Sequence, residues 1–210
     1  MSSMPMRPVF LGLVAGVLAA AGAVGAASPD EPRFTKTADL VRPANYREWT
    51  FLTSGLGMTY DTPGTEIGAS ANQTFTNVYV TPAAYRSFMK TGHWPDRTMF
   101  VLEARSSATE GSINRGGRFQ TTLGGIEVEV MDRKRFPKTK WGYFAFGPDA
   151  SASPTAKPLP DTAPCFTCHS QHGAVDATFV QFYPTLLEVA KRLGTLSPSH
   201  QDPLAPAAIR

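Results

Sequence analysis

The feature that most constrains this chain is a run of five residues near its C-terminal end, Cys165-Phe166-Thr167-Cys168-His169. The two cysteines are one helical turn apart, and the histidine follows the second cysteine directly. This spacing is typical of covalent haem attachment, in which each thiol forms a thioether with a porphyrin vinyl group and the imidazole binds the iron. We therefore predict one haem c held by Cys165 and Cys168, with His169 as an axial ligand of its iron.

The chain has two cysteines in total, and both lie in this run. The alternatives for such a pair are a structural disulfide, a thioredoxin-type redox pair and a zinc site. A redox pair requires a βαβ context, and a zinc site requires two further ligands at matching spacing. The sequence shows neither, and the histidine directly after the second cysteine favours haem.

The first 27 residues have the organisation of an export signal. Arg7 supplies a positive charge, residues 9–24 form an apolar run, and small residues surround Ala26. We predict a cleaved signal peptide over residues 1–27 and a periplasmic protein, because c-type haem is attached outside the cytoplasm. An uncleaved membrane anchor is the alternative, but the run is short and rich in alanine and glycine for a spanning helix. No second apolar run follows, so we expect no membrane association after cleavage.

The remainder of the chain fits one domain of ordinary size. We predict a flexible lead-in over residues 28–44, a haem-binding domain over residues 45–194 and a loose, proline-rich tail over residues 195–210. Hydrophobic residues make up 42% of the chain, which is enough to bury a core. The formal net charge of +3 gives no sign of the basic face that nucleic-acid binding needs.

The pattern of side chains indicates a β-rich domain. Ile126, Val128 and Val130 alternate with Glu127 and Glu129, which is typical of a half-buried strand. Further strands are expected over residues 75–80, 98–104 and 141–146.

Two helices are expected in the domain as well. The first runs over residues 82–92, with Thr81 as its cap and Pro82 in its first turn, and the second runs over residues 184–194. Residues 147–164 carry five prolines, so this segment is expected to be irregular and to lead the chain to the haem motif.

These elements decide between classes of haem protein. A small class I cytochrome c carries its attachment motif near the N-terminus and a methionine ligand downstream, whereas this motif is late and no methionine follows it. A four-helix cytochrome c-prime has a late motif, but several β-branched strands contradict a bundle. The predicted fold class is α+β, an antiparallel β-sheet with a few helices and a c-type haem held by the C-terminal region.

Several segments resemble the cytochrome P-460 family, which includes the β-type cytochromes c-prime. The resemblance runs from about Asn45 to Leu186 and rests on the haem motif and on these segments: Asn45-Tyr46-Arg47-Glu48-Trp49, Val78-Tyr79-Val80, Lys90-Thr91-Gly92, Arg135-Phe136-Pro137, Trp141-Gly142-Tyr143-Phe144, Leu159-Pro160 and residues 179–184. It implies a homodimer built on an antiparallel sheet, with the haem facing a largely apolar distal pocket.

One position of the resemblance bears on activity. In family members that oxidise hydroxylamine to nitrogen oxides, a lysine on the strand after the Lys-Thr-Gly segment is joined covalently to the porphyrin, just before a glutamate. The matching strand here reads Phe100-Val101-Leu102-Glu103, so Leu102 stands at the lysine position. An aliphatic side chain cannot form that bond. The resemblance therefore implies a gas-binding protein close to the β-type cytochromes c-prime.

The second side of the iron is a separate question. A six-coordinate electron carrier needs a distal methionine or histidine, and the candidates are Met58, Met89, Met99, Met131, His93, His172 and His200. We expect none of them on the iron and a distal pocket lined by Phe51, Phe75 and Leu102. Such an apolar pocket favours NO, because ferrous haem binds NO without a hydrogen-bond donor, whereas bound O₂ gains from one.

The sequence thus predicts a periplasmic mono-haem c-type cytochrome with five-coordinate iron that binds NO or another small nitrogen-containing ligand. One alternative is an oxidoreductase acting on hydroxylamine, and another is an electron-transfer cytochrome with a redox partner protein. Whether the protein is an enzyme stays open at this point, and no catalytic residue is assigned. Arg115 and Arg118 are candidates for pairing with haem propionates or for docking a redox partner, with a solvated loop as the alternative.

Overall fold

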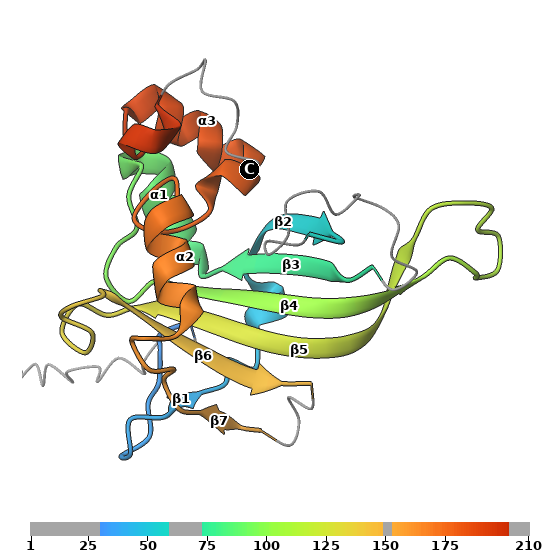
Figure 1. Ribbon diagram of the computed structural model, residues 1–210, viewed down its shortest axis with the longest axis horizontal. Helices are drawn as coiled ribbons and strands as arrows, with labels where there is room; N and C mark the ends of the chain where they lie inside the picture. Colours follow the sequence, from blue (N-terminus) through green and yellow to red (C-terminus); the bar gives the residue numbers. More distant parts are fainter. Residues whose placement is uncertain (1–29, 59–72, 149–152, 202–210) are drawn as a thin grey trace, which may run out of the picture.

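The computed structural model describes residues 30–58, 73–148 and 153–201, and its centre is one antiparallel sheet (Figure 1). The strand order is β2-β3-β4-β5-β6. The bounds of these strands are β2 (Thr50–Leu56), β3 (Phe75–Val80), β4 (Met99–Ala108), β5 (Phe119–Met131) and β6 (Trp141–Gly147). The α-helices in the described part are α1 (Pro82–Thr91), α2 (Pro164–His172) and α3 (Pro184–Leu193). The architecture confirms the predicted α+β class.

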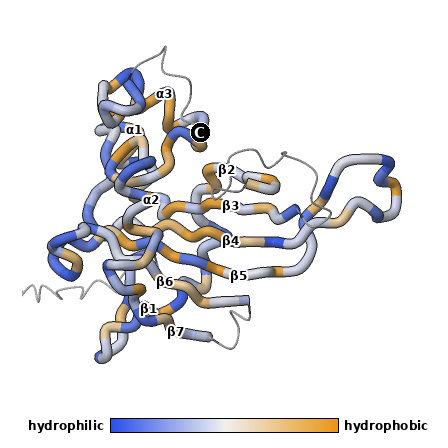
Figure 2. The backbone as a smooth tube through the Cα atoms, viewed as in Figure 1, coloured by the Kyte–Doolittle hydropathy of each residue, from blue (hydrophilic) through white to orange (hydrophobic). Residues whose placement is uncertain are grey.

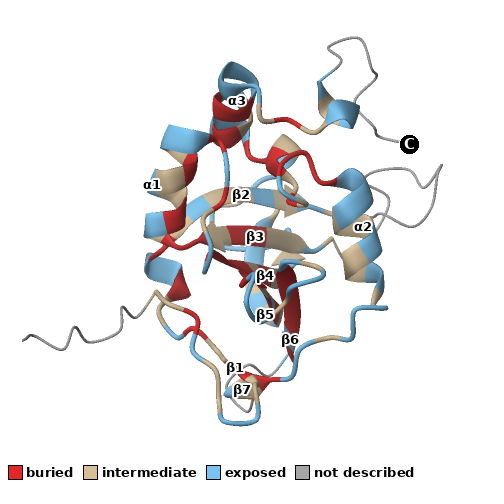
Figure 3. Ribbon diagram, turned by 90° about the vertical axis from the view of Figure 1, so that its left-hand side faces the viewer, coloured by how far each residue is buried: buried red, intermediate tan, exposed pale blue. Residues whose placement is uncertain are grey.

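Each side of the sheet buries its own core, because side chains alternate between the faces of every strand. The side that we call the helix face carries Val78, Phe100 and Tyr143, which pack with residues of α1, α2 and α3. The opposite side, the back face, carries Val101 and Val128. In Figure 3 the sheet lies between α3 at the top and the small pair β1 (Leu40–Val41) and β7 (Thr155–Ala156) at the bottom. Figure 2 shows the apolar middle of the central strands.

Helices α1 and α3 begin and end as the sequence predicts. Pro82 and Pro184 each stand in a first turn, where a missing N–H costs nothing, and Gly92 and Gly194 end α1 and α3 in the left-handed region. The side chain of Thr81 makes no capping hydrogen bond, which differs from the prediction. None of the described helices is both long and apolar enough to span a bilayer.

β4 and β5 are longer than the alternation of their side chains indicates. Their pairing continues to Ala108 opposite Phe119, so the two strands form a hairpin that projects beyond the rest of the sheet (Figure 1). The residues at this end are partly or fully exposed on both sides. Main-chain hydrogen bonds hold the pairing there, together with side-chain bonds such as the one from Arg105 to the carbonyl of Thr121. Main-chain bonds leave no period-2 pattern in the sequence.

The segments on either side of the predicted domain are also ordered where the structure describes them. β1 pairs with β7, and Leu40 is fully buried. Residues 30–44, expected to be a flexible lead-in, are thereby packed onto the back face. Leu196 is 8% exposed, and the Ser197 N–H donates to the carbonyl of Ala174 at 2.7 Å, so the first part of the expected tail is packed as well. The predicted signal peptide, residues 1–27, and residues 202–210 lie outside the described residues.

Candidate functional site

Helix α2 carries the Cys-x-x-Cys-His run on the helix-face side of the sheet (Figure 1). Pro164 occupies its first turn, and the helix ends at His172. Cys165 and His169 are four positions apart, so they share one side of the helix. Both thiols are free and partly exposed. The structure therefore presents two thiols and one imidazole from a single rigid element.

His169 is held in one orientation by the main chain. Its Nδ1–H donates to the carbonyl oxygen of Ala177 at 3.0 Å, because a carbonyl can only accept. The imidazole also lies between the rings of Tyr143 and Phe179, with centroids 4.7 and 4.4 Å away. This hydrogen bond fixes the proton on Nδ1 and leaves Nε2 free to bind a metal. Burial lowers the pKa of His169, against the opposing effect of the Ala177 carbonyl, so the neutral imidazole that a metal needs is favoured.

A tight turn after α2 delivers the Ala177 carbonyl to His169. Asp176 and Ala177 both have positive φ, at 48° and 60°, a conformation that non-glycine residues adopt only when their surroundings hold them there. Thr178 closes the turn by donating from its N–H and its hydroxyl to the carbonyl of Val175, at 2.8 and 2.7 Å. A Cβ at Gly173 would lie 2.6 Å from the carbonyl carbon of Ala177, so the close approach of the turn to α2 requires glycine.

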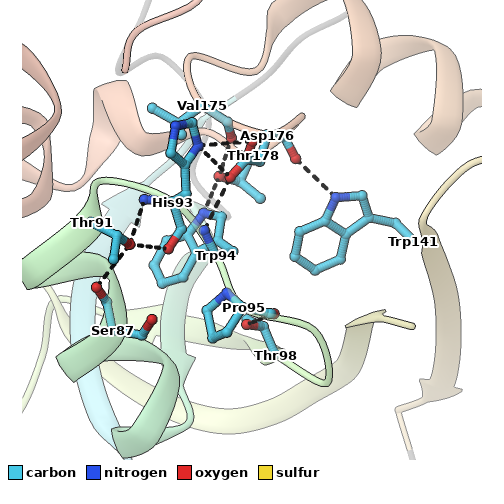
Figure 4. Close-up of polar contacts among 10 residues, drawn as sticks. All are labelled: Ser87, Thr91, His93, Trp94, Pro95, Thr98, Trp141, Val175, Asp176 and Thr178. Atoms are coloured by element: carbon cyan, nitrogen blue, oxygen red, sulfur yellow. Dashed lines mark hydrogen bonds and ion pairs between the residues drawn. The ribbon is translucent and has the colours of Figure 1, made fainter. Parts of the chain in front are cut away.

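Two tryptophans hold this turn in place (Figure 4). Trp94 donates from Nε1 to the hydroxyl of Thr178 at 2.9 Å and from its main-chain N–H to the carboxylate of Asp176 at 3.0 Å. Trp141 donates from Nε1 to the carbonyl of Asp176 at 2.9 Å. Nδ1 of His93 lies 3.1 Å from Asp176 Oδ2, so this candidate axial ligand is a partner of the turn instead. Residues 93–94 and Trp141, which are distant from the turn in sequence, thus converge on it behind His169.

Glu129 is a site residue that sequence reasoning missed. The alternation in β5 predicts a solvent-exposed side chain, but α2 covers this part of the helix face and the side chain is 11% exposed. Its Oε2 lies 3.3 Å from Nδ1 of His169, yet it makes no hydrogen bond with any described residue. Burial raises the pKa of Glu129 to about 8. A buried carboxyl therefore stands behind the predicted iron ligand without a cation of its own.

Beside α2 the helix face becomes uncovered. Val78, Leu102, Glu127 and Ala145 pair in register across four strands, and their exposure rises along this row from buried Val78 to exposed Glu127 and Ala145. We call Leu102, Glu127 and Ala145 the open stretch. Leu102 and Cys165 border the same buried core. The structure thus brings Leu102 and the attachment helix to one face.

The residues present fit a haem, since two free thiols and an imidazole with a fixed Nδ1 stand beside an uncovered part of the sheet. No cluster of three or more His, Cys, Asp or Glu side chains able to hold a metal ion exists among the described residues. The family model described as cytochrome P460 matches residues 43–180, about two thirds of the chain. The chain belongs to the cytochrome P460 family. Membership makes it a haem cytochrome with iron as its metal. No curated protein matches the chain.

Two predicted pocket residues of this cytochrome are placed differently from Leu102. Phe75 shares the alternation of Asn77 and Tyr79 in β3, which points to the back face. Phe51 pairs with Tyr79, has its ring 5.6 Å from the Tyr79 ring and is 53% exposed. The structure therefore does not bring Phe51 or Phe75 together with Leu102. A period-2 pattern identifies the strands but leaves open which face a haem meets.

The candidate distal ligands are mostly engaged elsewhere in the cytochrome. Met99 is buried in the back-face core and Met131 in the core beneath the helices, each 1% exposed. Met89 lies on α1, His172 is exposed at the end of α2, and Nδ1 of His200 lies 3.0 Å from the hydroxyl of Ser197. Met58 is different. Its sulfur lies so close to Gly55 that a Cβ added to this glycine would collide with Sδ. Gly55 pairs with Thr76, next to the open stretch.

Proposed function

We propose that this cytochrome holds one haem c through thioethers to Cys165 and Cys168, has His169 as its axial ligand, and binds NO in the periplasm. The observation that carries the proposal is the position of Leu102. This aliphatic side chain lies on the same face of the sheet as the attachment helix. Hydroxylamine-oxidising proteins that the chain resembles have a crosslinking lysine at this position. Without that lysine, ligand binding at an open iron position is favoured over oxidation of hydroxylamine.

The surroundings of Leu102 suit NO for a chemical reason. Ferrous haem with one histidine ligand binds NO strongly without help from a distal donor, whereas bound O₂ gains from a hydrogen bond. Leu102 offers no such donor. The haem, when bound, would supply a redox-active iron with a free coordination position. The chain supplies the fixed imidazole of His169.

Absorption spectra of the purified ferrous protein, before and after addition of NO, test this proposal. We expect a high-spin, five-coordinate spectrum that changes on addition of NO at micromolar concentration. A low-spin, six-coordinate spectrum before any gas is added would overturn it. A strongly red-shifted Soret band, with peptide mapping of a haem-bound lysine, would support the crosslinked hydroxylamine oxidase instead.

Substitution of Leu102 sharpens the test. Leu102→Gln places a hydrogen-bond donor beside the ligand, and we expect the affinity for O₂ to rise by about fivefold, since one net hydrogen bond contributes about 1 kcal/mol. Leu102→Ile keeps an apolar side chain of similar volume, adds no sulfur that could bind the iron, and serves as the control. Equal O₂ affinity in the two variants would show that position 102 lies away from the bound gas.

Met58 favours one competing function, a six-coordinate electron-transfer cytochrome. Its sulfur lies over Gly55 at the edge of the helix face, beside the open stretch. Met58→Leu removes the sulfur with little change in volume. A low-spin ferric wild type together with a high-spin variant would support the electron-transfer function and contradict the NO-binding function.

The proposed location and assembly rest on the sequence. The charged and apolar pattern of residues 1–27 supports export, and fractionation of cells that produce the protein tests it. The family resemblance supports a homodimer, which sedimentation of the haem-loaded protein tests. A cytoplasmic product without haem would contradict the first of these, and a monomer at micromolar concentration the second.

A further inference from the structure

The turn between β5 and β6 is the most basic segment of the molecule. Residues 132–140 contain a quarter of the chain's 20 lysines and arginines, and all of these side chains are exposed: Arg133, Lys134, Arg135, Lys138 and Lys140. Figure 2 shows the turn as a hydrophilic loop at the left end of the sheet. We call these five residues the basic turn. Such a concentration of one charge attracts an oppositely charged surface.

The acidic residues around the basic turn do not neutralise it. Asp132 is 7% exposed and accepts from the main-chain N–H of Arg135 at 2.8 Å, and its Oδ2 lies 3.9 Å from Nε of Arg135, so it offsets one of the five cations. Arg133 lies 3.7 Å from Asp96, which is a long contact between exposed groups. Within residues 30–58, 73–148 and 153–201, no ion pair involves Lys134, Lys138 or Lys140. These three ammonium groups are available to a partner.

The basic turn adjoins the haem-attachment helix through an apolar cavity. This cavity has a volume of about 310 Å³ and is lined by Lys138 of the turn, by Phe166 of the Cys-x-x-Cys-His run and by Phe136, Pro137 and Leu159, with Asp161 at its margin. An apolar centre with charged residues around it is the usual anatomy of a protein–protein interface. The basic turn and this cavity therefore lie directly against α2, the helix of the Cys-x-x-Cys-His run.

We propose that the basic turn docks an acidic electron-transfer protein, a proposal that rests on the presence of the haem argued above. On docking, the reduced partner loses one electron, ferric iron gains it and becomes ferrous, and no covalent bond changes. A membrane surface is a weaker fit, because the basic residues lie on a turn around a recessed apolar cavity and not along an amphipathic helix. The acidic partner also explains why the cations gather beside α2.

This location differs from the one that the sequence suggested for partner docking. Arg115 and Arg118 lie in the connection between β4 and β5, at the opposite end of the sheet from the basic turn (Figure 1). Arg118 donates to the hydroxyl of Ser107 at 3.0 Å and so supports its own hairpin. The two sites allow a matched comparison, because a double charge reversal at either end changes the net charge equally.

Stopped-flow reduction of the ferric holoprotein by a reduced flavodoxin of strongly negative net charge is the test. We expect the second-order rate constant of the wild type to fall with added salt, and to be lower by about tenfold or more in Lys134→Glu/Lys138→Glu at low salt. Arg115→Glu/Arg118→Glu should stay within about twofold of the wild type. Equal slowing in both variants, or no salt dependence, would overturn the proposal.

Two further measurements make the outcome specific. Oxidation of the ferrous protein by hexacyanoferrate(III), an anion, should slow in Lys134→Glu/Lys138→Glu, whereas oxidation by tris(bipyridine)cobalt(III), a cation, should become faster. Loss of binding to phosphatidylglycerol vesicles in this variant, with unchanged flavodoxin kinetics, would identify a membrane site and overturn the proposal. The NO spectrum of each variant is the separate check on the proposed function, since a protein can bind NO normally and still lack the docking site.

Discussion

Glu103 and Glu129 belong to neighbouring strands of one sheet, lie on opposite faces of it, and are both largely buried, yet their surroundings shift their pKa values in opposite directions. On the back face, the Glu103 side chain is 2% exposed and accepts hydrogen bonds from the Tyr46 hydroxyl and from the guanidinium groups of Arg47 and Arg105. On the helix face, Glu129 is 11% exposed and has the His169 imidazole as its polar neighbour.

The neighbours of each carboxylate, and not its depth, decide its charge. Burial alone would raise the pKa of Glu103, but hydrogen bonds from Arg105, Tyr46 and Arg47 outweigh it and hold the pKa at about 2. Burial of Glu129 meets no such compensation, and its pKa is raised to about 8. One face thus uses a buried carboxylate as an anchor for the segment around Tyr46, while the other keeps a poorly ionised carboxyl next to the iron ligand.

The largest expected effect comes from removing the anchor. Glu103→Ala leaves Arg47 and Arg105 without their buried partner, and we expect the free energy of unfolding to fall by about 3–5 kcal/mol. Chemical denaturation of the haem-loaded protein measures it. Glu127→Ala, an exposed position one strand away on the open stretch, should change the value by about 0.5 kcal/mol or less. Similar losses in the two variants would show that Glu103 is no anchor.

The next effect is the pH dependence that Glu103 confers. Its pKa in the folded protein lies below the ordinary value of 4.5, so the unfolded chain binds more protons between these two values. This stability is present above pH 4.5 and falls as the pH approaches 2, by about 3 kcal/mol. Denaturation curves at several acidic pH values measure it. In Glu103→Gln this contribution should vanish and the curve should be flatter over that window.

A smaller loss of stability is expected from a change to the main-chain packing behind His169, which involves no charged group. Gly173→Ala pushes a methyl group against the main chain of Ala177, so we expect a loss of about 1–3 kcal/mol and a weakened hydrogen bond to His169. Thermal unfolding and the reduction potential of the haem check the two consequences. Gly116→Ala is the control, because a Cβ there meets no atom within 4 Å. An unchanged potential in Gly173→Ala would contradict the role of the turn.

The smallest effect on stability should follow the change to Glu129. Glu129→Gln removes a carboxyl that has no cationic partner, so the free energy of unfolding should change by about 1 kcal/mol or less. The reduction potential should still rise above about pH 8, where Glu129 is ionised, because negative charge near Nδ1 makes the imidazole a stronger electron donor. Potentiometric titration beside denaturation tests both statements. A loss as large as that of Glu103→Ala would remove the contrast between the two faces.

Much of the fold follows from the sequence because local signals determine it. Alternating apolar residues located β4 and β5, and runs of β-branched or aromatic residues located β3 and β6. Proline at the start with glycine at the end located α1 and α3. The haem motif and Leu102 followed from residue type at fixed positions. Strands β1 and β7 were not predicted, because their two-residue pairing depends on Leu40 meeting a strand more than a hundred residues away.

The errors in the site have a common physical cause. The alternation in β5 separates Glu129 from Val128 but cannot tell that a helix 35 residues later covers the polar face. Phe75 was assigned to the pocket for its residue type, although its strand parity follows Tyr79. Trp94 and Trp141 converge on one turn only in three dimensions. Tertiary contacts of this kind have no local signature.

The acceptor of the His169 hydrogen bond is a main-chain carbonyl, and this has a consequence for inheritance. No codon change at position 177 deletes that oxygen, so mutation reaches it only through the residues that shape the turn, such as Gly173, Trp94 and Trp141. Distant descendants of this chain can therefore carry another side chain at 177 and keep the contact, provided that the residue tolerates the positive φ, as glycine and asparagine do. The contact depends on the backbone conformation of the turn, so the residue type at position 177 does not reveal it.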